Sequence, residues 1–216
     1  MDLKGTDRGR LLDYVAAQIN QWFPDHYAGD VRPAIDRDLD SALDRLRTCL
    51  TGVRVWRPGE FDYLHSSQYT IFLYYLANTI WRNRQQENPC TKLFYLNKAL
   101  NGFECFYDND LPDVFFVGHS VGVVLVRAKY PRHFAVYQNC TVGRDHGGGP
   151  TLEEGVVMYP GSAIIGPCWV RARSYLAAGA VLIGRDTPGD CLVFAAGAEP
   201  VFKRPKRDIL ADIFRL

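Results

Sequence analysis

The sequence predicts an α+β fold in which an N-terminal helical domain is followed by a C-terminal parallel β-helix. Two observations support this. Apolar residues recur at intervals of three and four in the first half, which is helical spacing, whereas aliphatic residues recur every six residues in the second half, which is typical of hexapeptide β-helices. We therefore divide the 216-residue chain into a helical domain (1–103), a β-helix (104–202) and a basic C-terminal tail (203–216).

The helical half contains three stretches of apolar residues at helical spacing. They are Leu11, Leu12, Val15, Ile19 and Trp22, then Leu39, Leu43, Leu46 and Leu50, and then Tyr69, Phe72, Leu73, Leu76 and Ile80. Prolines separate these stretches, as expected of residues that end helices, at Pro24, Pro33, Pro58 and Pro89.

From residue 152 the chain divides into consecutive frames of six residues. Each frame begins with an aliphatic residue or methionine: Leu152, Met158, Ile164, Val170, Leu176 and Leu182. The fifth position is small in all frames but the last: Val156, Ser162, Cys168, Ser174, Ala180 and then Asp186. In a triangular coil the first residue points inward, where the coils above and below bury it, and the fifth lies near a corner. A conventional antiparallel sandwich is the alternative.

Upstream of residue 152 the register is less regular. It continues through Leu111, Val117 and Val123, and after a slip of one residue through Val136 and Val142. The glycine-rich segment 143–151 then breaks the register by four residues, so we expect it to form a loop that leaves the coil.

The composition argues against several classes of function. The chain has 25 Lys and Arg against 24 Asp and Glu, which argues against a broad surface for nucleic acid or membrane. No apolar run reaches the roughly 18–20 residues of a membrane-spanning helix, and the polar first ten residues predict no secretion signal. The six cysteines are scattered without a C-x-x-C pair, so we expect core residues, no metal site and a cytoplasmic protein.

Four segments follow one another along the chain, the first in the predicted helical half and the other three in the predicted β-helix. They are residues 75–83 (YLANTIWRN), 118–124 (GHSVGVV), 136–143 (VYQNCTVG) and 195–197 (AAG). In this order they resemble the serine acetyltransferase family of hexapeptide-repeat acyltransferases, and the likeness runs from about Tyr69 to Lys203. The resemblance implies a left-handed parallel β-helix and the transfer of an acetyl group from acetyl-CoA to a hydroxyl.

The resemblance also implies a general base. An alcohol is a poor nucleophile near neutral pH and needs a base, and His119 occupies the position of the family's catalytic histidine. A carboxylate that holds the second imidazole nitrogen would orient this base. The family's acid lies fifteen residues upstream, which here is Glu104. Asp108 and Asp110 are alternatives, and all three could be solvated acids instead.

The acceptor-binding positions depart from the family. Gly118 replaces the aspartate that helps to hold the amino group of serine. In the segment 145–150 only Pro150 matches the family's Arg-His-Pro, although His146 is a candidate substitute for the missing histidine. An ammonium or carboxylate buried without a partner is costly. We therefore expect a sugar or another neutral hydroxyl compound as acceptor, with L-serine as the alternative.

The acyl donor is predicted to lie against small residues of the coils. By resemblance these are Gly143, Gly161, Ala178 and Gly179, where missing side chains permit close approach. Lys203 and Arg204 begin the segment KRPKR, which would bind the CoA phosphates or form an ordinary solvated tail. The family resemblance implies a homotrimer, or a hexamer made of two trimers. A non-catalytic β-helix scaffold is the alternative to an enzyme.

Overall fold

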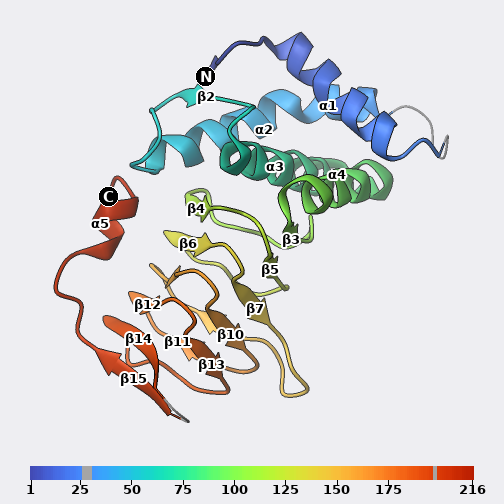
Figure 1. Ribbon diagram of the computed structural model, residues 1–216. Coiled ribbons are helices and arrows are strands. Elements are labelled where there is room, and N and C mark those ends of the chain that lie inside the picture. Colours follow the sequence, from blue (N-terminus) through green and yellow to red (C-terminus); the bar gives the residue numbers. More distant parts are fainter. Residues whose placement is uncertain (26–30, 197–198) are drawn as a thin grey trace.

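The computed structural model describes residues 1–25, 31–196 and 199–216, and it places a layer of helices on one end of a β-solenoid (Figure 1). The helices of the layer are α1 (Arg8–Trp22), α2 (Arg32–Gly52), α3 (Ser66–Arg84) and α4 (Glu87–Asn101). A short parallel pair, β1 (Asp2–Leu3) and β2 (Glu60–Phe61), joins the N-terminus to this layer. Within the described residues, no helix is sufficiently long and apolar to span a membrane.

Local sequence explains where these helices begin and end. Asp7 caps α1 by accepting a hydrogen bond from the backbone N–H of Arg10, which satisfies one of the free N–H groups at a helix start. Gly102 ends α4 with φ +62°, a left-handed conformation that glycine adopts without strain. Residues 67–80 of α3 are all buried. A helix that is buried on every side must lie inside its domain, and α3 packs against both α2 and α4.

The solenoid consists of three sheets of stacked, parallel strands. Sheet 1 contains β3 (Phe103–Cys105), β5 (Val123–Leu125), β7 (Thr141–Gly143), β10 (Ala163–Ile165) and β13 (Val181–Ile183). Sheet 2 contains β4 (Phe115–Gly118), β6 (Phe134–Tyr137), β9 (Val157–Met158), β12 (Ser174–Leu176) and β14 (Cys191–Ala196), followed by the antiparallel β15 (Glu199–Lys203). Sheet 3 contains β8 (Thr151–Leu152) and β11 (Trp169–Val170).

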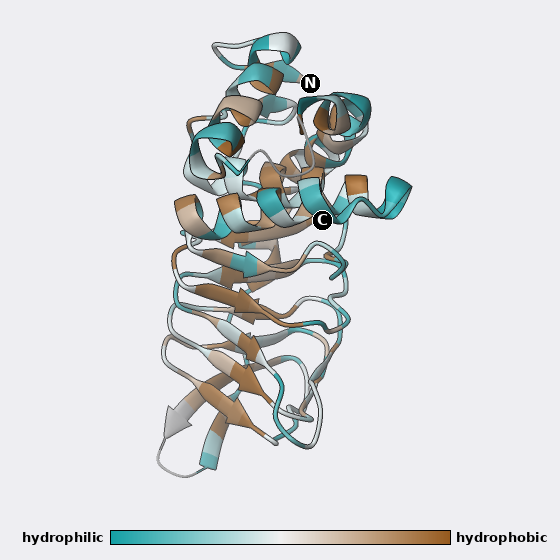
Figure 2. Cartoon of the chain, turned by 90° about the vertical axis from the view of Figure 1, so that its right-hand side faces the viewer, coloured by the Kyte–Doolittle hydropathy of each residue, from teal (hydrophilic) through white to brown (hydrophobic). Residues whose placement is uncertain are grey.

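Aliphatic residues stacked from coil to coil form the solenoid core. The predicted first positions, Leu152 through Leu182, are all at most 2% exposed, and Figure 2 shows apolar residues along the stacked strands. The fifth positions from Val156 to Ala180 are equally buried, whereas Asp186 is exposed. These burials, together with the parallel pairing of the strands, confirm the predicted fold of a helical domain followed by a β-helix.

Upstream of residue 152 the structure differs from the predicted register in one place. Val123 is interior as expected, but the residue that stacks in line with Val142 is Leu125. Seven residues separate Val117 from Leu125, against five between Val136 and Val142, the pair that stacks on them. The turn after β4, which contains His119, is therefore two residues longer than the turn below it.

The tail does not extend freely into solvent. After β15 it crosses the edge of sheet 2 and forms the short helix α5 (Ile209–Ile213) beside the helical domain (Figure 1). We call residues 204–216 the C-terminal strap. Four of its apolar residues are buried, Ile209, Leu210, Ile213 and Phe214, whereas Leu216 is exposed. The Arg215 guanidinium donates hydrogen bonds to four carbonyls at the end of α2 and in the loop that follows it, those of Thr51, Val53, Arg54 and Trp56.

Candidate active site

His119 lies in the turn that follows β4. Its backbone adopts φ +60°, a left-handed conformation that is uncommon outside glycine but is found more often for asparagine, aspartate and histidine than for other residues. The residue is exposed, between the buried Gly118 and Ser120. Among the described residues none forms a hydrogen bond or ion pair with its imidazole. The ring is thus free to contact a ligand.

Below His119 the turns between sheet 2 and sheet 1 stack directly on one another. Backbone N–H groups of Asn139, Gly161 and Gly179 donate to the carbonyls of Val121 (2.9 Å), Gln138 (3.0 Å) and Pro160 (2.9 Å) in the turn above each. At the top, the Gly122 N–H donates to the carbonyl of Gly102 at the end of α4 (3.0 Å). We call these stacked turns the turn column. They bring His119 to the same edge of the solenoid as three of the predicted donor-binding residues, Gly161, Ala178 and Gly179.

The lower turn column is open to a ligand. A Cβ atom on Gly179 would meet no atom within 4 Å, and one on Gly161 would approach only the backbone nitrogen of Gly179, at 3.9 Å. Both glycines have φ near +70°, which a side chain would strain. Glycine is therefore required here by the turn, and it leaves backbone exposed along the column.

Other predicted donor-binding residues lie elsewhere in the protomer. Gly143 ends β7 at the opposite edge of sheet 1, where its carbonyl accepts from Gly166 N–H at 3.1 Å. Lys203 pairs with Leu192 near the start of β14, across sheet 2 from the turn column. A single protomer does not bring the whole predicted set together.

Each candidate partner of His119 has a cation of its own. Glu104 lies in the middle of β3, where a carboxylate oxygen is 2.7 Å from Lys98 Nζ, and both side chains are about half exposed. Asp108 pairs with Arg127, and Asp110 lies 3.9 Å from Arg82. Within this protomer the three acids are thus engaged with cations and not with the imidazole.

His146 lies on an exposed loop between β7 and β8, at the corner of sheets 1 and 3. Asp145 and Gly148 exchange backbone hydrogen bonds, and the Asp145 carboxylate accepts from the Gly147 N–H at 2.7 Å. These bonds form the predicted loop outside the coil. The loop belongs to a different corner of the solenoid from His119.

Aromatic rings line the outer face of sheet 2 beside His119. The ring of Trp56 lies 5.4 Å from that of Phe116, Phe116 lies 5.6 Å from Tyr137, and Tyr137 stacks on Tyr159 at 5.4 Å and 20°. A Cβ atom on Gly118 would lie 2.7 Å from Tyr137 Cε1 and 2.9 Å from Phe116 Cε1. No aspartate fits at position 118 unless these rings move.

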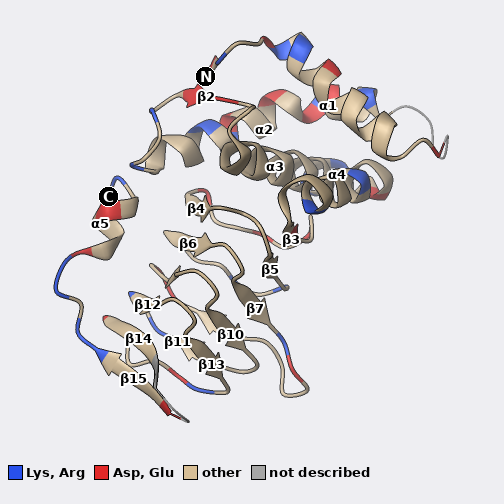
Figure 3. Ribbon diagram, viewed as in Figure 1, with Lys and Arg blue, Asp and Glu red and all other residues tan. Residues whose placement is uncertain are grey.

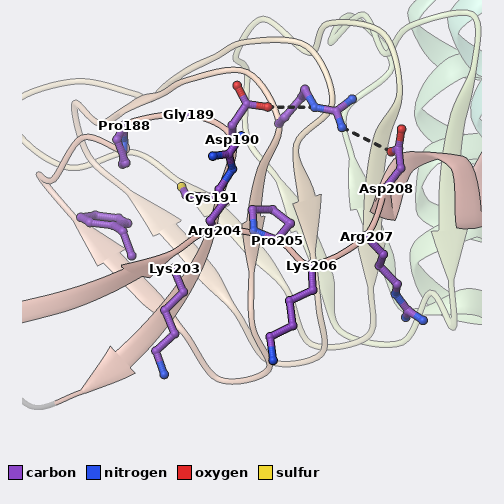
Figure 4. A pocket seen from close by; sticks show the side chains of 12 residues that line it. Pro188, Gly189, Asp190, Cys191, Lys203, Arg204, Pro205, Lys206, Arg207 and Asp208 are labelled. Atoms are coloured by element: carbon purple, nitrogen blue, oxygen red, sulfur yellow. Dashed lines mark hydrogen bonds and ion pairs between the residues drawn. The ribbon is translucent and has the colours of Figure 1, made fainter.

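The basic residues of the strap surround a pocket of about 610 Å³ (Figure 4). Arg173 crosses it and pairs with Asp190 at 2.9 Å and with Asp208 at 3.4 Å. Figure 3 shows basic residues along the connection from β15 to α5. Within the described residues Arg204 and Lys206 form no ion pair, so both are available to an anion. No group of three or more potential metal-binding side chains occurs among the described residues.

Comparison with known proteins gives a fold relationship. No protein-family model matches the chain, and no curated protein matches it in sequence. Among solved structures, the serine acetyltransferase of Vibrio cholerae O1 biovar El Tor N16961 superposes with a TM-score of 0.66 at 16% identity, over 95% of this chain and 83% of that one. The chain has the fold of a serine acetyltransferase. This confirms the predicted resemblance at the level of fold.

Two further structures with this fold hold ligands. Serine acetyltransferase isoform 3 of Entamoeba histolytica, solved with cysteine, has a TM-score of 0.63 at 16% identity over 94% of this chain and 74% of that one. The enzyme of Brucella abortus strain S19, solved with coenzyme A, has a TM-score of 0.61 at 15% identity over 90% and 83%.

The aromatic rings beside His119 are the part of the site that sequence reasoning missed. Tyr137 and Tyr159 each follow an interior residue of the register, Val136 and Met158, so both occupy the same outward position on successive strands. Aromatic residues at one outward position of consecutive coils are the signal that would have located this surface. Of the resemblance motifs, Gly197 lies outside the described residues.

Proposed function

We propose that this protein is an acetyl-CoA-dependent O-acetyltransferase that acts on a hydroxyl of a small molecule or sugar, with His119 as general base. One observation carries the proposal. An exposed imidazole without a partner among the described residues heads a column of stacked turns whose lower members contain Gly161 and Gly179. The fold is shared with serine acetyltransferases, one of which was solved with coenzyme A.

The chemistry needs no covalent enzyme intermediate. His119 removes the proton of the acceptor hydroxyl while its oxygen attacks the thioester carbonyl. A C–O bond forms, the C–S bond breaks, and the imidazolium returns the proton to the CoA sulfur. All six cysteines are buried, which supports direct transfer in a ternary complex rather than an acyl-cysteine.

We place the pantetheine arm of acetyl-CoA along the turn column, against Gly161, Ala178 and Gly179. Gly143 and the basic pair Lys203 and Arg204 lie on other edges of the protomer, so these residues would complete a donor site only across a subunit contact. We therefore propose a homotrimer or a hexamer. The exposed Val181 and Ile183 on the outer face of sheet 1 support association, and a molar mass from light scattering equal to one chain would contradict it.

We assign Glu104 as the carboxylate that orients His119. The first coil of the solenoid contains both residues, and Gly122 N–H of the His119 turn bonds to Gly102 O, two residues before Glu104. This role requires Glu104 to exchange Lys98 for the imidazole. We expect Glu104→Gln to lower kcat at least tenfold with little effect on the KM for acetyl-CoA. An unchanged kcat would mean that Glu104 does not orient His119. In that case either Asp108 or Asp110 has this role, or no carboxylate has it.

Two acceptor classes compete. The space that an aspartate at position 118 would need is filled by aromatic rings, which leaves no carboxylate at that position for an ammonium group and favours a neutral hydroxyl compound. L-Serine is the second candidate, because the solved neighbours are serine acetyltransferases. His146 would contribute to acceptor binding only from a neighbouring subunit, since its loop lies at another corner.

The decisive experiment compares two histidines with the same backbone geometry. His133 also has positive φ, at 59°, but it lies at a different corner and pairs with Glu154 at 3.0 Å. Asparagine tolerates this conformation, so His119→Asn and His133→Asn preserve the turns better than alanine. Release of CoA is measured with a thiol reagent over a panel of L-serine, glycerol and methyl glycosides.

We expect His119→Asn to lower kcat by about 10²–10⁴-fold and His133→Asn to retain activity. Turnover of His119→Asn close to that of the wild type would exclude His119 as the base. Acceptor-dependent release from no member of the panel, with folded wild-type protein, would favour a non-catalytic scaffold.

A further inference from the structure

Tyr137 and Tyr159 form a half-exposed aromatic surface at the edge of sheet 2. Higher in the same row of rings Trp56 and Phe116 are only 7% and 8% exposed, whereas the two tyrosines remain partly open to solvent. Their rings stack at 5.4 Å with an interplanar angle of 20°. Burial of one side of each ring raises the pKa of both hydroxyls above 10, so both stay protonated near neutral pH.

The strand register places this surface next to His119. Gly118 pairs with Tyr137 between β4 and β6, so the residue after Gly118 enters the turn directly above the residue after Tyr137. The Tyr137 ring lies against the backbone of Gly118 itself. A molecule that covers the tyrosine rings therefore lies within reach of the base at the head of the turn column.

The C-terminal strap brings charged residues near the same surface. It covers the half of sheet 2 that is farther from the turn column, where Ala135, Val157 and Tyr175 are at most 1% exposed. On the strap, Arg207 pairs with Asp212 at 3.1 Å, and the charges of both act on the Tyr159 hydroxyl. Charged residues of the strap therefore lie near the aromatic surface formed by Tyr137 and Tyr159.

Next to Tyr137 in the chain, Gln138 has a side-chain oxygen without a hydrogen-bond donor among the described residues. Gln138 lies in the turn beneath that of His119, and this oxygen, Oε1, is buried. A buried carbonyl oxygen without a donor is unfavourable. A ligand hydroxyl that reached it after a rotation of the Gln138 side chain would supply the missing donor.

We propose that the acceptor is a carbohydrate whose ring lies on Tyr137 and Tyr159 and presents one hydroxyl to His119. A pyranose has a face of C–H groups that packs on aromatic rings and an edge of hydroxyls that suits Gln138, Arg207 and Asp212. A free amino acid or a short alcohol is too small to cover both rings. The proposal rests on the proposed O-acetyltransferase function and specifies its acceptor and two specificity-determining residues.

The test uses the full-length protein with methyl β-D-glucopyranoside and methyl β-D-galactopyranoside as probes and glycerol as the acyclic comparison. The variants are Tyr159→Ala and Tyr137→Ala, each with its phenylalanine counterpart that keeps the ring. Tyr95→Ala serves as control, because Tyr95 is 55% exposed on the helical domain. Melting temperatures establish that each variant folds, and only folded variants are compared.

We expect each alanine variant to raise the KM for the preferred glycoside at least tenfold and the KM for acetyl-CoA less than twofold. The phenylalanine variants should restore most of the acceptor affinity. Wild-type turnover with glycerol or L-serine but with neither glycoside would overturn the carbohydrate assignment and leave the acetyltransferase function standing. An equal loss with glycoside and glycerol would also overturn it.

Binding is measured separately by saturation-transfer NMR, so that the proposal can be tested without turnover. Glycoside signals that appear with wild type and His119→Asn, and that disappear with Tyr159→Ala, support binding on the aromatic surface even where catalysis fails. Glycoside signals that are absent from wild type, or unchanged in Tyr159→Ala, contradict it.

Discussion

At the scale of single residues, Gly118 and Tyr137 determine each other. The backbone of Gly118 has an ordinary conformation, so the constraint comes from the neighbouring rings, which leave no space for a Cβ atom. Glycine at this position therefore belongs together with an aromatic residue at position 137. A side chain at position 118 and the present position of the Tyr137 ring therefore exclude each other.

This coupling can be measured. We expect Gly118→Ala to lower the free energy of unfolding by about 1–3 kcal/mol, the usual cost of overpacking, because the new methyl group must displace the Tyr137 ring. In the double variant Gly118→Ala, Tyr137→Ala the ring is absent, so the two effects should fail to add by at least about 0.5 kcal/mol. Urea unfolding of the wild type, the two single variants and the double variant measures this double-mutant cycle. Additive effects would show that the ring moves aside freely.

The sequence predicted some residues of the site and not others, for identifiable physical reasons. The position of His119 follows from a local motif, whose turn the register then places at a corner. The partner of His119 does not follow, because Glu104, Asp108 and Asp110 all lie within a few residues of the right spacing and their choice depends on side-chain rotamers. The surface formed by Tyr137 and Tyr159 depends on which strands are neighbours, a long-range property.

At the scale of elements, the six-residue register predicted the coils that follow residue 152 in the chain. It was wrong in one turn that precedes this residue. Every interior aliphatic position from Leu152 to Leu182 was predicted, because identical coils repeat one local rule. The turn with His119 is longer, and Val123 is itself buried, so burial alone does not reveal the two added residues. The two added residues make the turn wider, and His119 and Val121 are exposed in it.

The C-terminal strap was predicted only as a basic tail. Its apolar residues are few and its helix has only five residues, too short to be recognised by periodicity. Its position depends on Arg215, whose contacts lie more than 150 residues away in sequence. No local signal identifies such a contact.

The strap allows a stability prediction. Arg215→Ala leaves the carbonyls of residues 51–56 without their cationic donor, so we expect unfolding to become easier by about 1.5–3 kcal/mol. Hydrogen exchange in residues 51–56 should accelerate as well. Arg47→Ala is the matched control, because Arg47 makes only an exposed ion pair with Asp44 at 3.0 Å, worth at most about 1 kcal/mol. Equal effects of the two substitutions would show that the strap is not held by Arg215.

At the scale of the whole molecule, helical domain and solenoid form one continuous core. The buried cysteines are part of it, from Cys49 in α2 to Cys191 in β14. Cys49 lies at the junction, where its Sγ–H donates to the carbonyl of Phe115 at 3.2 Å. Burial raises the pKa of the Cys49 thiol to about 12. The thiol is thus neutral and unreactive in the folded protein, whereas the unfolded chain exposes it with a pKa near its ordinary value.

This difference predicts a loss of stability in alkaline solution. Above about pH 9 the unfolded chain loses the Cys49 proton while the folded protein retains it, so the free energy of unfolding falls as pH rises toward 12. The contribution of this group approaches about 1.4 kcal/mol per pH unit. Other buried groups also titrate in this range, so the Cys49→Ala variant is needed to isolate the contribution of the Cys49 thiol. We expect the variant to be less stable than wild type at pH 7, because a small cavity forms. Between pH 9 and 11, however, its free energy of unfolding should fall less steeply than that of wild type. Urea unfolding at pH 7, 9, 10 and 11 measures both slopes, and equal slopes would mean that Cys49 ionises in the folded state as readily as in the unfolded chain.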